Sequence, residues 1–369
     1  MIVDRRRGSS LYPIISGERR GLYGGAVRMA LGGAAAAYSV VSGARMRKYL
    51  KKEKTEIGVP VVSVGNITVG GTGKTPVCRY LARRYERKGL RVGIATRGYG
   101  REGGGTAILH SGEKIESWHH CGDEAVLFTR GSKNVTVAVN ADRAAAARAL
   151  ERDRGCDMVL MDDGFQFVTL KREVDIVVLD GYNPLGFGKL IPAGLLREPV
   201  GSLERANVFW LAKADVMESG EKEVLVRRLR EDFPGRPIVE SIYRPLGFSR
   251  LRRPGDLEPP ESFDGMNVLC ISGIGTPESF ENLVEKITGR APACFRFTDH
   301  HAFGANELEE AEKEAMRTGA DMIFTTEKDA VRIPEFFKPK LKWRVLEIGV
   351  KVTAMHGFME GVPLFGIID

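Results

Sequence analysis

Val64-Gly65-Asn66-Ile67-Thr68-Val69-Gly70-Gly71-Thr72-Gly73-Lys74-Thr75-Pro76 joins an apolar run to a helical pattern through a glycine-rich loop that ends in Gly-Lys-Thr. Glycines in such a loop let backbone N–H groups approach a polyphosphate. Lys74 can reach the β- and γ-phosphates, and the Thr75 hydroxyl can ligate Mg²⁺. The helix that follows directs its positive N-terminal end toward the same point. The stretch therefore predicts a nucleotide phosphate site.

The segments on either side of this loop support the prediction. Residues 59–64 are typical of a buried strand, and from Pro76 apolar residues recur at helical spacing until Gly89. The strict phosphate-loop pattern has glycine where this chain has Thr68. The alternative is a glycine-rich turn with a chance Gly-Lys-Thr, and the order of strand, loop and helix favours the phosphate site.

Composition sets wide limits. The chain has 369 residues, enough for two domains, and its 43% hydrophobic content can fill ordinary cores. A net charge of +7 admits an anionic substrate, nucleic acid or an acidic membrane surface without choosing among them. The five cysteines form no C-x-x-C pair, so we expect neither a disulfide framework nor a zinc site, as in a reducing cytoplasm.

The first fifty residues combine basic and small apolar residues. Basic residues lie on both sides of residues 21–44, a stretch rich in alanine and glycine that contains Arg28. A spanning helix needs about 20 strongly apolar residues, so we rank an interfacial helix above a span. In that case Leu31, Tyr38, Val40 and Val41 would dip into an anionic leaflet. The alternative is a helix packed on the protein itself.

Alternating short apolar runs and helical patterns continue to about residue 215, as a parallel sheet with crossover helices requires. The predicted strands are residues 92–96, 135–139, 158–161, 176–179 and 208–211, with a helix over 141–152. A charged helix over 221–231 and a short strand over 238–242 follow. Residues 244–264 carry four prolines and predict a linker. Strand and helix patterns then return at 267–272, 277–287, 308–317, 322–325 and 343–348, which predicts a second, smaller α/β domain.

Two carboxylates follow the run Met158-Val159-Leu160-Met161. Asp162 and Asp163 stand at the end of a strand, where an acid completes the Mg²⁺ shell in many phosphate-loop proteins. A plain turn is the alternative, and the upstream loop favours the metal.

Three further segments leave their roles open. Asp123 lies at the start of a predicted helix and is either a capping residue or a functional acid. Asp299-His300-His301 is either a surface loop or a part of the site that the second domain brings to the phosphates. Residues 181–199 are too rich in glycine and proline for regular structure, and there Arg197 either steadies a phosphate or forms a surface ion pair with an acid such as Glu198.

Taken together, these segments resemble the tetraacyldisaccharide 4'-kinase family, the lipid A 4'-kinases of Gram-negative bacteria. The matching motifs run in the family's order over nearly the whole chain: residues 64–76, Arg97-Gly98-Tyr99-Gly100, Gly122-Asp123-Glu124, Asp162-Asp163-Gly164-Phe165-Gln166, 180–194, Leu196-Arg197-Glu198-Pro199, Asp299-His300 and Thr326-Glu327-Lys328-Asp329-Ala330-Val331. Each motif alone is weak, but the set is highly specific.

The resemblance implies transfer of the γ-phosphate of ATP to the 4'-hydroxyl of an acylated glucosamine disaccharide 1-phosphate, at the cytoplasmic face of the inner membrane. It implies an α/β fold with a phosphate-loop NTPase-like parallel sheet, a membrane-associated N-terminal helix (1–55), a kinase core (56–240) and a smaller C-terminal α/β domain (241–369). We expect peripheral or interfacial attachment to an anionic membrane surface and no nucleic-acid partner. The oligomeric state is not predicted.

The resemblance also implies roles for single residues. It makes Asp123 the base toward the sugar hydroxyl and pairs it with His300, while the residues alone leave open which of the two finally holds the proton. The expected site residues fall into four groups: catalytic Asp123, His300, Lys74 and Arg197; nucleotide-binding Thr68, Val69, Gly70, Gly71, Thr72, Gly73, Lys74 and Thr75; Mg²⁺-binding Thr75, Asp162, Asp163 and Glu124; and substrate-binding Asn66, Arg97, Tyr99, Gln166 and Arg197.

Two other functions compete with this one. The first is a membrane-bound nucleotide-switch ATPase. Such proteins often have a lysine at the position of Val69, and its absence here counts against this function. A separate motif, Lys213-Ala214-Asp215, is weakly similar to the base-reading Lys-x-Asp of GTP-binding proteins. A non-enzymatic membrane or nucleic-acid binder fits the positive charge but lacks the interleaved aromatic and basic residues of a nucleic-acid surface.

Overall fold

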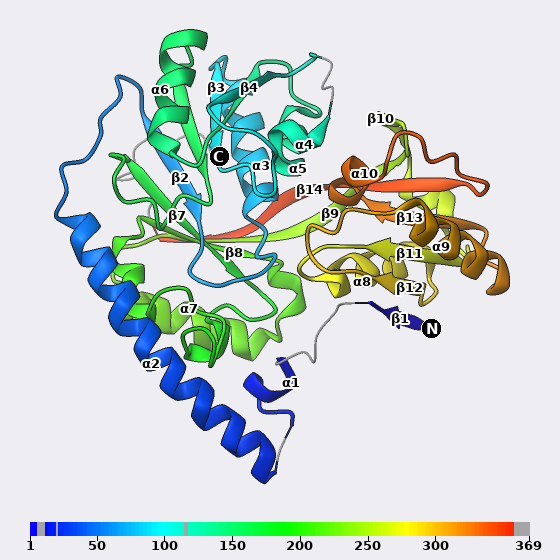
Figure 1. Cartoon of the computed structure of the whole chain (residues 1–369), viewed down its shortest axis with the longest axis horizontal. Helices are drawn as coiled ribbons and strands as arrows, with labels where there is room; N and C mark the ends of the chain where they lie inside the picture. The colour runs from blue at the N-terminus through cyan, green and yellow to red at the C-terminus, as the bar shows by residue number, and fades with distance from the viewer. Residues whose placement is uncertain (6–11, 20, 114–116, 358–369) are drawn as a thin grey trace.

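The computed structural model describes residues 1–5, 12–19, 21–113 and 117–357. They form one 14-stranded mixed sheet in the order β1-β12-β11-β13-β14-β9-β8-β7-β2-β6-β3-β5-β4, and β10 pairs with β9 beside this path. Figure 1 shows the two ends of the sheet as separate groups of strands and helices, joined by the long strands β9 and β14. We call these groups the N-terminal half and the C-terminal half.

The N-terminal half is a parallel sheet with one antiparallel edge strand. Its strands are β2 (Val61–Gly65), β3 (Val92–Thr96), β4 (Ala107–His110), β5 (Val135–Val139), β6 (Met158–Asp162), β7 (Val174–Asp180) and β8 (Val208–Ala212), and β4 is antiparallel to β5. Its helices are α3 (Lys74–Arg87), α4 (Trp118–Cys121), α5 (Asp123–Thr129), α6 (Arg143–Arg154) and α7 (Ser219–Asp232). The parallel strands predicted here are confirmed.

Alternation along β2 shows why this sheet is covered on both faces. Val62 and Val64 point to the core that α3 covers, whereas Val61 points to the core that α6 covers. Strands buried on both faces are continuous apolar runs, which is the pattern that the sequence has. The five cysteines are free and buried.

The C-terminal half repeats this design on a smaller scale. Its strands are β1 (Ile2–Asp4), β11 (Val268–Ser272), β12 (Ala293–Arg296) and β13 (Met322–Thr326), and its helices are α8 (Pro277–Thr288), α9 (Ala305–Arg317) and α10 (Glu327–Arg332). One apolar core lies under α9 and the other under α8. The strand β1 adds to the edge of this half by pairing in parallel with β12, which the sequence did not predict.

The predicted linker over 244–264 is wrong. The region is occupied by β9 (Ile238–Arg250), β10 (Arg253–Glu258) and the 3-10 helix η4 (Pro260–Phe263), and β9 pairs antiparallel with β14 (Trp343–His356) over its whole length. Pro245 is tolerated because the register of this pair shifts beside it, between Glu347 and Ile348, as at a β-bulge. Strand β14 is therefore also much longer than the predicted 343–348.

The N-terminal region contains the short helix α1 (Tyr12–Ile15) and the long helix α2 (Leu22–Leu50), which runs along the outside of the N-terminal half (Figure 1). Val40 and Val41 are each 68% exposed, whereas Leu31 and Tyr38 are half-buried. Tyr38 donates a hydrogen bond to the carbonyl of Arg197, so α2 contacts the protein there. None of the helices in the described ranges is long and apolar enough to cross a membrane.

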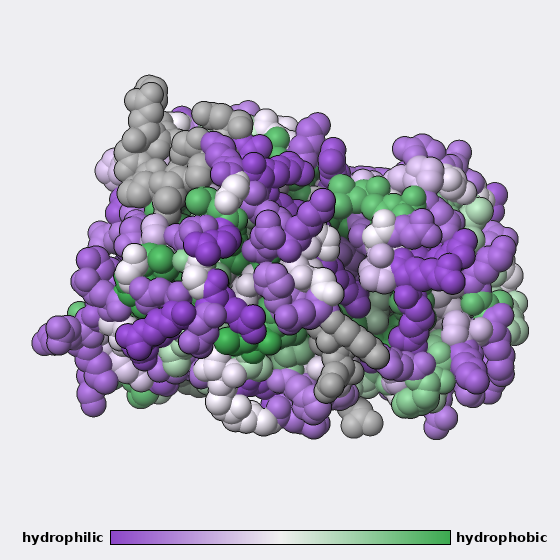
Figure 2. All heavy atoms as spheres, turned by 90° about the horizontal axis from the view of Figure 1, so that it is seen from above, coloured by the Kyte–Doolittle hydropathy of each residue, from purple (hydrophilic) through white to green (hydrophobic). Residues whose placement is uncertain are grey.

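The face seen from above in Figure 2 is mostly hydrophilic, and the hydrophobic side chains that it shows form small separate areas. Such a surface is typical of a protein face in contact with water.

Candidate active site

The phosphate loop, residues 66–73, connects β2 to α3 as the sequence predicted. Gly70 and Gly73 have φ of 108° and 94°, which side chains other than glycine rarely adopt. The amide of Asn66 donates to the carbonyl of Thr68 (2.7 Å) and to the hydroxyl of Thr72 (2.9 Å), so it fixes the loop from inside. The loop thus presents its glycine-rich segment and the N-terminus of α3 to the same space.

A cavity of about 560 Å³ lies between the two halves at this loop. Its lining includes polar groups, from the phosphate loop after Gly70, Arg97, Tyr99 and His300, and the apolar residues Ile274, Phe280, Leu283 and Ile348. A cavity that combines apolar side chains with a few converging polar groups is the usual form of a small-molecule site. The loop after β11 closes it on one side, where a Cβ on Gly275 would come within 2.5 Å of the Gly71 nitrogen.

Five predicted residues do not line this cavity: Asp123, which is described below, and four residues at or beside the phosphate loop. Asn66 is fully buried, and Gln166 donates from its amide to the Asn66 carbonyl (2.9 Å) and to Glu198 (3.0 Å). The backbone N–H of Val69 donates to the Leu195 carbonyl (2.8 Å), and Thr68 forms an isolated bridge with Leu196. These side chains and backbone groups are used to shape the phosphate loop and the neighbouring loop 181–199.

Asp163 forms ion pairs with two cationic side chains of the site. Its carboxylate lies 3.5 Å from the Lys74 Nζ and accepts hydrogen bonds from the Arg197 Nη1 at 3.1 Å. Burial opposes the charged form, but the Lys74 and Arg197 cations outweigh it and lower the pKa of Asp163 to about 2. Arg197 therefore pairs with Asp163, while Glu198 pairs with Arg205 (2.8 Å).

Asp162 has the opposite surroundings. It is buried at the end of β6, and its Oδ2 accepts a hydrogen bond from the Thr96 hydroxyl at 3.2 Å. Within the described residues its Oδ1 has no hydrogen-bond partner. Burial, together with the charges of Glu124 and Asp163, raises the pKa of Asp162 to about 8. A buried carboxylate in this state favours a bound cation.

The donor set fits Mg²⁺ better than a metal held by protein ligands alone. In the described part of the chain no group of three or more His, Cys, Asp or Glu side chains is arranged to hold a metal ion by itself. Mg²⁺ usually binds through one or two carboxylates together with waters and substrate phosphates. Asp162 and Asp163 at the phosphate loop, with Glu124 also lining the cavity, provide such a set.

The C-terminal half brings His300 to Asp123, which is 177 residues away in the sequence. The His300 Nδ1 lies 3.0 Å from the Asp123 Oδ2, and the Asp123 Oδ1 accepts a hydrogen bond from the N–H of Glu124 (2.9 Å). Asp123 is only 2% exposed, whereas His300 lines the cavity. His301 turns away and pairs with Glu307 at 2.8 Å.

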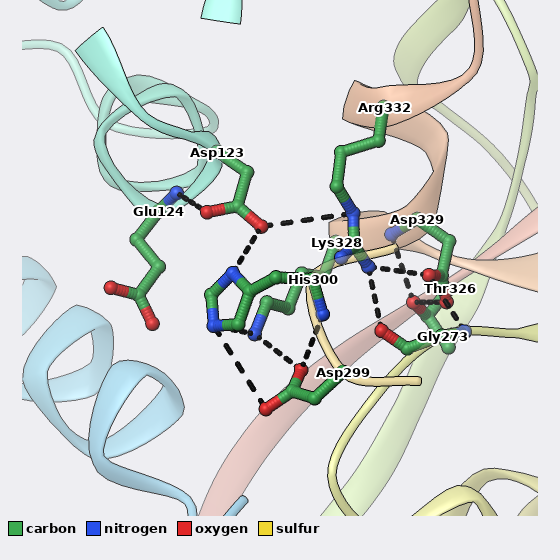
Figure 3. A network of polar contacts seen from close by, with 9 residues as sticks. All are labelled: Asp123, Glu124, Gly273, Asp299, His300, Thr326, Lys328, Asp329 and Arg332. Carbon is green, nitrogen blue, oxygen red and sulfur yellow. Dashed lines mark hydrogen bonds and ion pairs between the residues drawn. The ribbon is translucent and has the colours of Figure 1, made fainter. Parts of the chain in front are cut away.

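Helix α10 holds this arrangement together (Figure 3). We call Asp123, Asp299, His300, Lys328 and Arg332 the α10 cluster. Arg332 is buried, with its Nε 3.7 Å from the Asp123 Oδ2, and it donates to the Gly273 carbonyl (2.8 Å). Burial opposes the charge on Asp123, but the hydrogen bond from His300 and the cations of Lys328 and Arg332 lower its pKa.

Other residues at the site were missed by sequence reasoning. The Arg79 guanidinium on α3 binds both oxygens of Glu327 on α10 (2.9 and 3.0 Å), which ties the phosphate-loop helix to the α10 cluster. Arg143 is buried, and its charge acts on Asp163. The sequence offers only one signal for these contacts, namely that Glu327 lies in the motif 326–331.

The two charged side chains of the weak base-reading motif, Lys213-Ala214-Asp215, have different partners in the structure. Lys213 is buried and donates to Asp180 (2.8 Å) and to the Gly71 carbonyl (3.1 Å), so it supports the phosphate loop. Asp215 does not line the cavity and pairs with Lys286 at 3.3 Å. The two side chains therefore do not form one base-reading site.

Comparison with known proteins identifies a matching family model, similar sequences and a similar solved structure. The family model described as tetraacyldisaccharide-1-P 4'-kinase matches residues 27–362. Proteins named tetraacyldisaccharide 4'-kinase are 39% identical in Anaeromyxobacter dehalogenans strain 2CP-C (75% of this chain, 73% of the relative) and 35% identical in Syntrophobacter fumaroxidans (81% and 79%). The crystal structure of LpxK from Aquifex aeolicus in complex with ATP is similar with a TM-score of 0.69 at 27% identity, covering 89% of this chain and 95% of that one.

Proposed function

Because the chain belongs to the tetraacyldisaccharide-1-P 4'-kinase family, the kinases of lipid A biosynthesis, we propose that its cavity binds ATP with Mg²⁺ beside the sugar of an acylated disaccharide 1-phosphate. The observation that carries this proposal is that the phosphate loop and the Asp123–His300 pair meet at one cavity between the two halves. Phosphoryl transfer needs positioning and charge neutralisation more than covalent chemistry.

The phosphate side of the cavity is assigned to the loop and its cations. Backbone N–H groups from Gly70 to Gly73 bind the phosphates, and Lys74 and Arg197 balance their charge as the phosphoryl group moves. Asp162, Asp163, Glu124 and Thr75 would hold Mg²⁺, which when bound neutralises phosphate charge. Arg97 and Tyr99 line the same cavity and are assigned to the lipid substrate.

The acceptor side is assigned to Asp123 and His300. An attacking hydroxyl must lose its proton, and a carboxylate paired to an imidazole provides an acceptor for it. His300 faces the cavity, while Asp123 behind it orients the ring and balances any positive charge on it. The division of the chain at residues 55 and 240 stays a prediction.

Transfer of labelled γ-phosphate from ATP and Mg²⁺ to tetraacyldisaccharide 1-phosphate in detergent micelles tests this function. We expect labelled lipid from the wild-type protein and none above background from Lys74→Ala. Lys88→Ala, at an exposed lysine just after the same helix, is the matched control and should retain full activity. ATP hydrolysis without labelled lipid would instead support the nucleotide-switch ATPase.

We also propose that α2 lies on the cytoplasmic face of the inner membrane. It exposes apolar side chains, with Met29 at 81% and Val40 and Val41 at 68%, and its C-terminal part carries the basic residues Arg45, Arg47 and Lys48. Exposed apolar side chains beside basic ones favour binding to an anionic leaflet.

Replacing Val40 and Val41 with serine tests this attachment. We expect binding to vesicles with anionic lipid to weaken on the order of 10-fold, because two apolar side chains would no longer be buried in lipid. Co-sedimentation measures the effect. Val224→Ser on α7, a valine that is 53% exposed, is the matched control. Equal binding by both variants would place α2 away from the membrane.

A further inference from the structure

Lys328 makes contacts that the proposed mechanism does not yet use. It belongs to the motif 326–331 and lies at the start of α10, where its Nζ is 2.9 Å from the Asp299 Oδ1 and 3.0 Å from the His300 Nε2 (Figure 3). The side chain is 20% exposed and lines the cavity. An ammonium group therefore lies against the imidazole nitrogen opposite the one that faces Asp123.

This contact determines which nitrogen of His300 carries the proton. A lysine ammonium has only donors, so at 3.0 Å the Nε2 must be the acceptor and cannot carry a hydrogen itself. The ring proton is then on Nδ1, from which it is donated to the Asp123 Oδ2. Burial lowers the pKa of Lys328, but the carboxylates of Asp299, Glu124 and Asp123 outweigh this effect and raise it, so the side chain is charged at neutral pH.

The neighbouring histidine shows the opposite arrangement. The His301 Nε2 lies 2.8 Å from the Glu307 Oε2, and a carboxylate oxygen can only accept. His301 therefore carries a proton on Nε2, whereas His300 does not. Two adjacent histidines in one loop are set to different protonation patterns by their partners, which provides an internal reference for measurement.

Without Lys328, the charges around His300 would favour a proton on Nε2. The Asp299 Oδ2 lies 3.9 Å from this nitrogen, and Asp123 already binds the other side of the ring. The charged or titratable groups facing His300 from the surrounding elements are Asp123 and Glu124 on α5, Asp299 beside it, Lys328 and Arg332 on α10, and Tyr99, whose ring centroid is 5.0 Å away. Among these, Lys328 is the cation in contact with Nε2.

We propose that Lys328 is a positioning residue that keeps the His300 Nε2 unprotonated until the sugar hydroxyl takes the place of its ammonium group. This inference rests on the proposed function. In the transfer step the hydroxyl O–H bond breaks and its proton goes to the Nε2. The oxygen forms a bond to the γ-phosphorus, and the bond from that phosphorus to the bridging oxygen breaks to leave ADP. Asp299, which holds the Lys328 ammonium at 2.9 Å, keeps it near when it is displaced.

The protonation of His300 can be observed directly. The chain has six histidines, so selective ¹⁵N-histidine labelling of the full-length protein gives few imidazole signals, and the loss of one pair in His300→Gln assigns them. In the wild type at neutral pH we expect the His300 Nδ1 to be protonated and the Nε2 unprotonated, whereas the His301 Nε2 should carry a proton. In Lys328→Met the His300 Nε2 should become protonated, while His301 stays unchanged.

Kinetics then test whether this protonation matters. We expect Lys328→Met to lower kcat about 10²-fold with KM for ATP within about 2-fold, and Lys328→Arg to retain most of the activity because it keeps a cationic donor. Lys328→Met with Asp299→Asn should recover much of the loss, because the carboxylate that favours a proton on Nε2 is removed. A merely structural role would not be rescued by a second substitution. Lys313→Met on the exposed side of α9 is the control.

Several results would overturn the proposal. A protonated Nε2 in the wild type would contradict the assignment, and so would an unchanged kcat in Lys328→Met. A large rise in KM for ATP with unchanged ¹⁵N signals would make Lys328 a phosphate ligand instead. The ¹⁵N readout does not depend on turnover, so a protein inactive on the lipid would refute the proposed function while leaving the assignment of Lys328 open to its own test.

Discussion

The phosphate loop and the α10 cluster meet at one cavity, which the cluster reaches through Asp299, His300 and Lys328, yet the two regions are assembled in different ways. The phosphate loop is one short segment between β2 and α3, and its conformation depends on local contacts such as those of Asn66. The α10 cluster joins α5, the loop after β12 and α10, and its central contact spans 177 positions. In the proposed function, local contacts thus serve the nucleotide, which many proteins bind, and long-range contacts serve the acceptor.

The direct link between these two regions is also informative. Arg79 lies on the helix that the phosphate loop starts, and Glu327 lies on α10. The closing loop at Gly275 also approaches Gly71. The two regions are therefore in direct contact. If they bind the phosphates and position the acceptor as proposed, substitutions can separate the two functions or reveal their coupling.

The largest effect should come from Asp123→Asn, which disturbs the α10 cluster and leaves the phosphate loop intact. Asparagine is nearly isosteric, but its amide can donate to the His300 Nδ1 and so reverse the tautomer. We expect kcat to fall about 10²- to 10⁴-fold, the range of general acid–base catalysis, with unchanged affinity for ATP. Single-turnover transfer and equilibrium ATP binding measure the two quantities.

Asp157→Asn is the control, since this aspartate pairs with Arg91 away from the cavity. If Asp123→Asn weakened ATP binding as much as turnover, the two regions could not be treated as separate. Near-normal turnover would show that Asp123 is not needed to activate the sugar hydroxyl.

The same contrast explains what the sequence could predict. The phosphate loop, the parallel strands and the helices α3, α6 and α9 follow from local patterns, because strands buried on both faces and amphipathic helices carry their own periodicity. The prolines in 244–264 hid the pairing of β9 with β14, since no local feature shows that Pro245 lies beside a shift in register. Asp123 and His300 were paired only through the family resemblance.

Contacts between distant charged residues are the least predictable part of the site. Arg79 and Glu327 are 248 positions apart, and each alone has the pattern of an exposed helical residue. Lys328 lies in the motif 326–331, but the sequence assigns it no role, because its role depends on which nitrogen of His300 it contacts. Burial and partner identity, which decide the chemistry of these groups, exist only in the folded chain.

Asp162→Asn should have a smaller but more specific effect, on the nucleotide side. We expect Mg²⁺-dependent turnover to fall about 10²-fold, because a group that places charge at the phosphates is lost. Without Mg²⁺, the free energy of unfolding of the variant should instead be higher than that of the wild type at high pH. Burial and the charges of Glu124 and Asp163 raise the pKa of Asp162 to about 8, so the folded protein loses stability as pH rises from about 4 to 8.

Thermal unfolding in EDTA at pH 4 and pH 8.5 measures this second effect. The variant should unfold like the wild type at pH 4 and at a higher temperature at pH 8.5, where an ionised Asp162 destabilises only the wild type. Added Mg²⁺ should stabilise the wild type more than the variant. Equal Mg²⁺ responses would remove Asp162 from the metal site.

The smallest effect on turnover should come from Arg79→Met, which breaks the link between the two regions. Both side chains of this pair are largely buried, at 11% and 9% exposure, so the variant leaves the Glu327 carboxylate buried without its partner. We expect a loss of about 3–5 kcal/mol in the free energy of unfolding, measured by urea denaturation. Arg79→Met with Glu327→Gln should recover a large part of it, because glutamine keeps an oxygen for the Ile348 N–H.

The double variant then shows whether the pair also aligns the two regions. Once stability is restored, ATP binding depends on the phosphate loop alone and should be near normal. Transfer depends on the distance between the phosphates and the α10 cluster, and we expect kcat to stay about 10-fold below the wild type, since small displacements of reacting groups lower rates strongly. A double variant with normal kcat would show that Arg79 and Glu327 only stabilise the fold, and that closure of the cavity around its ligands is sufficient to bring the two regions into register.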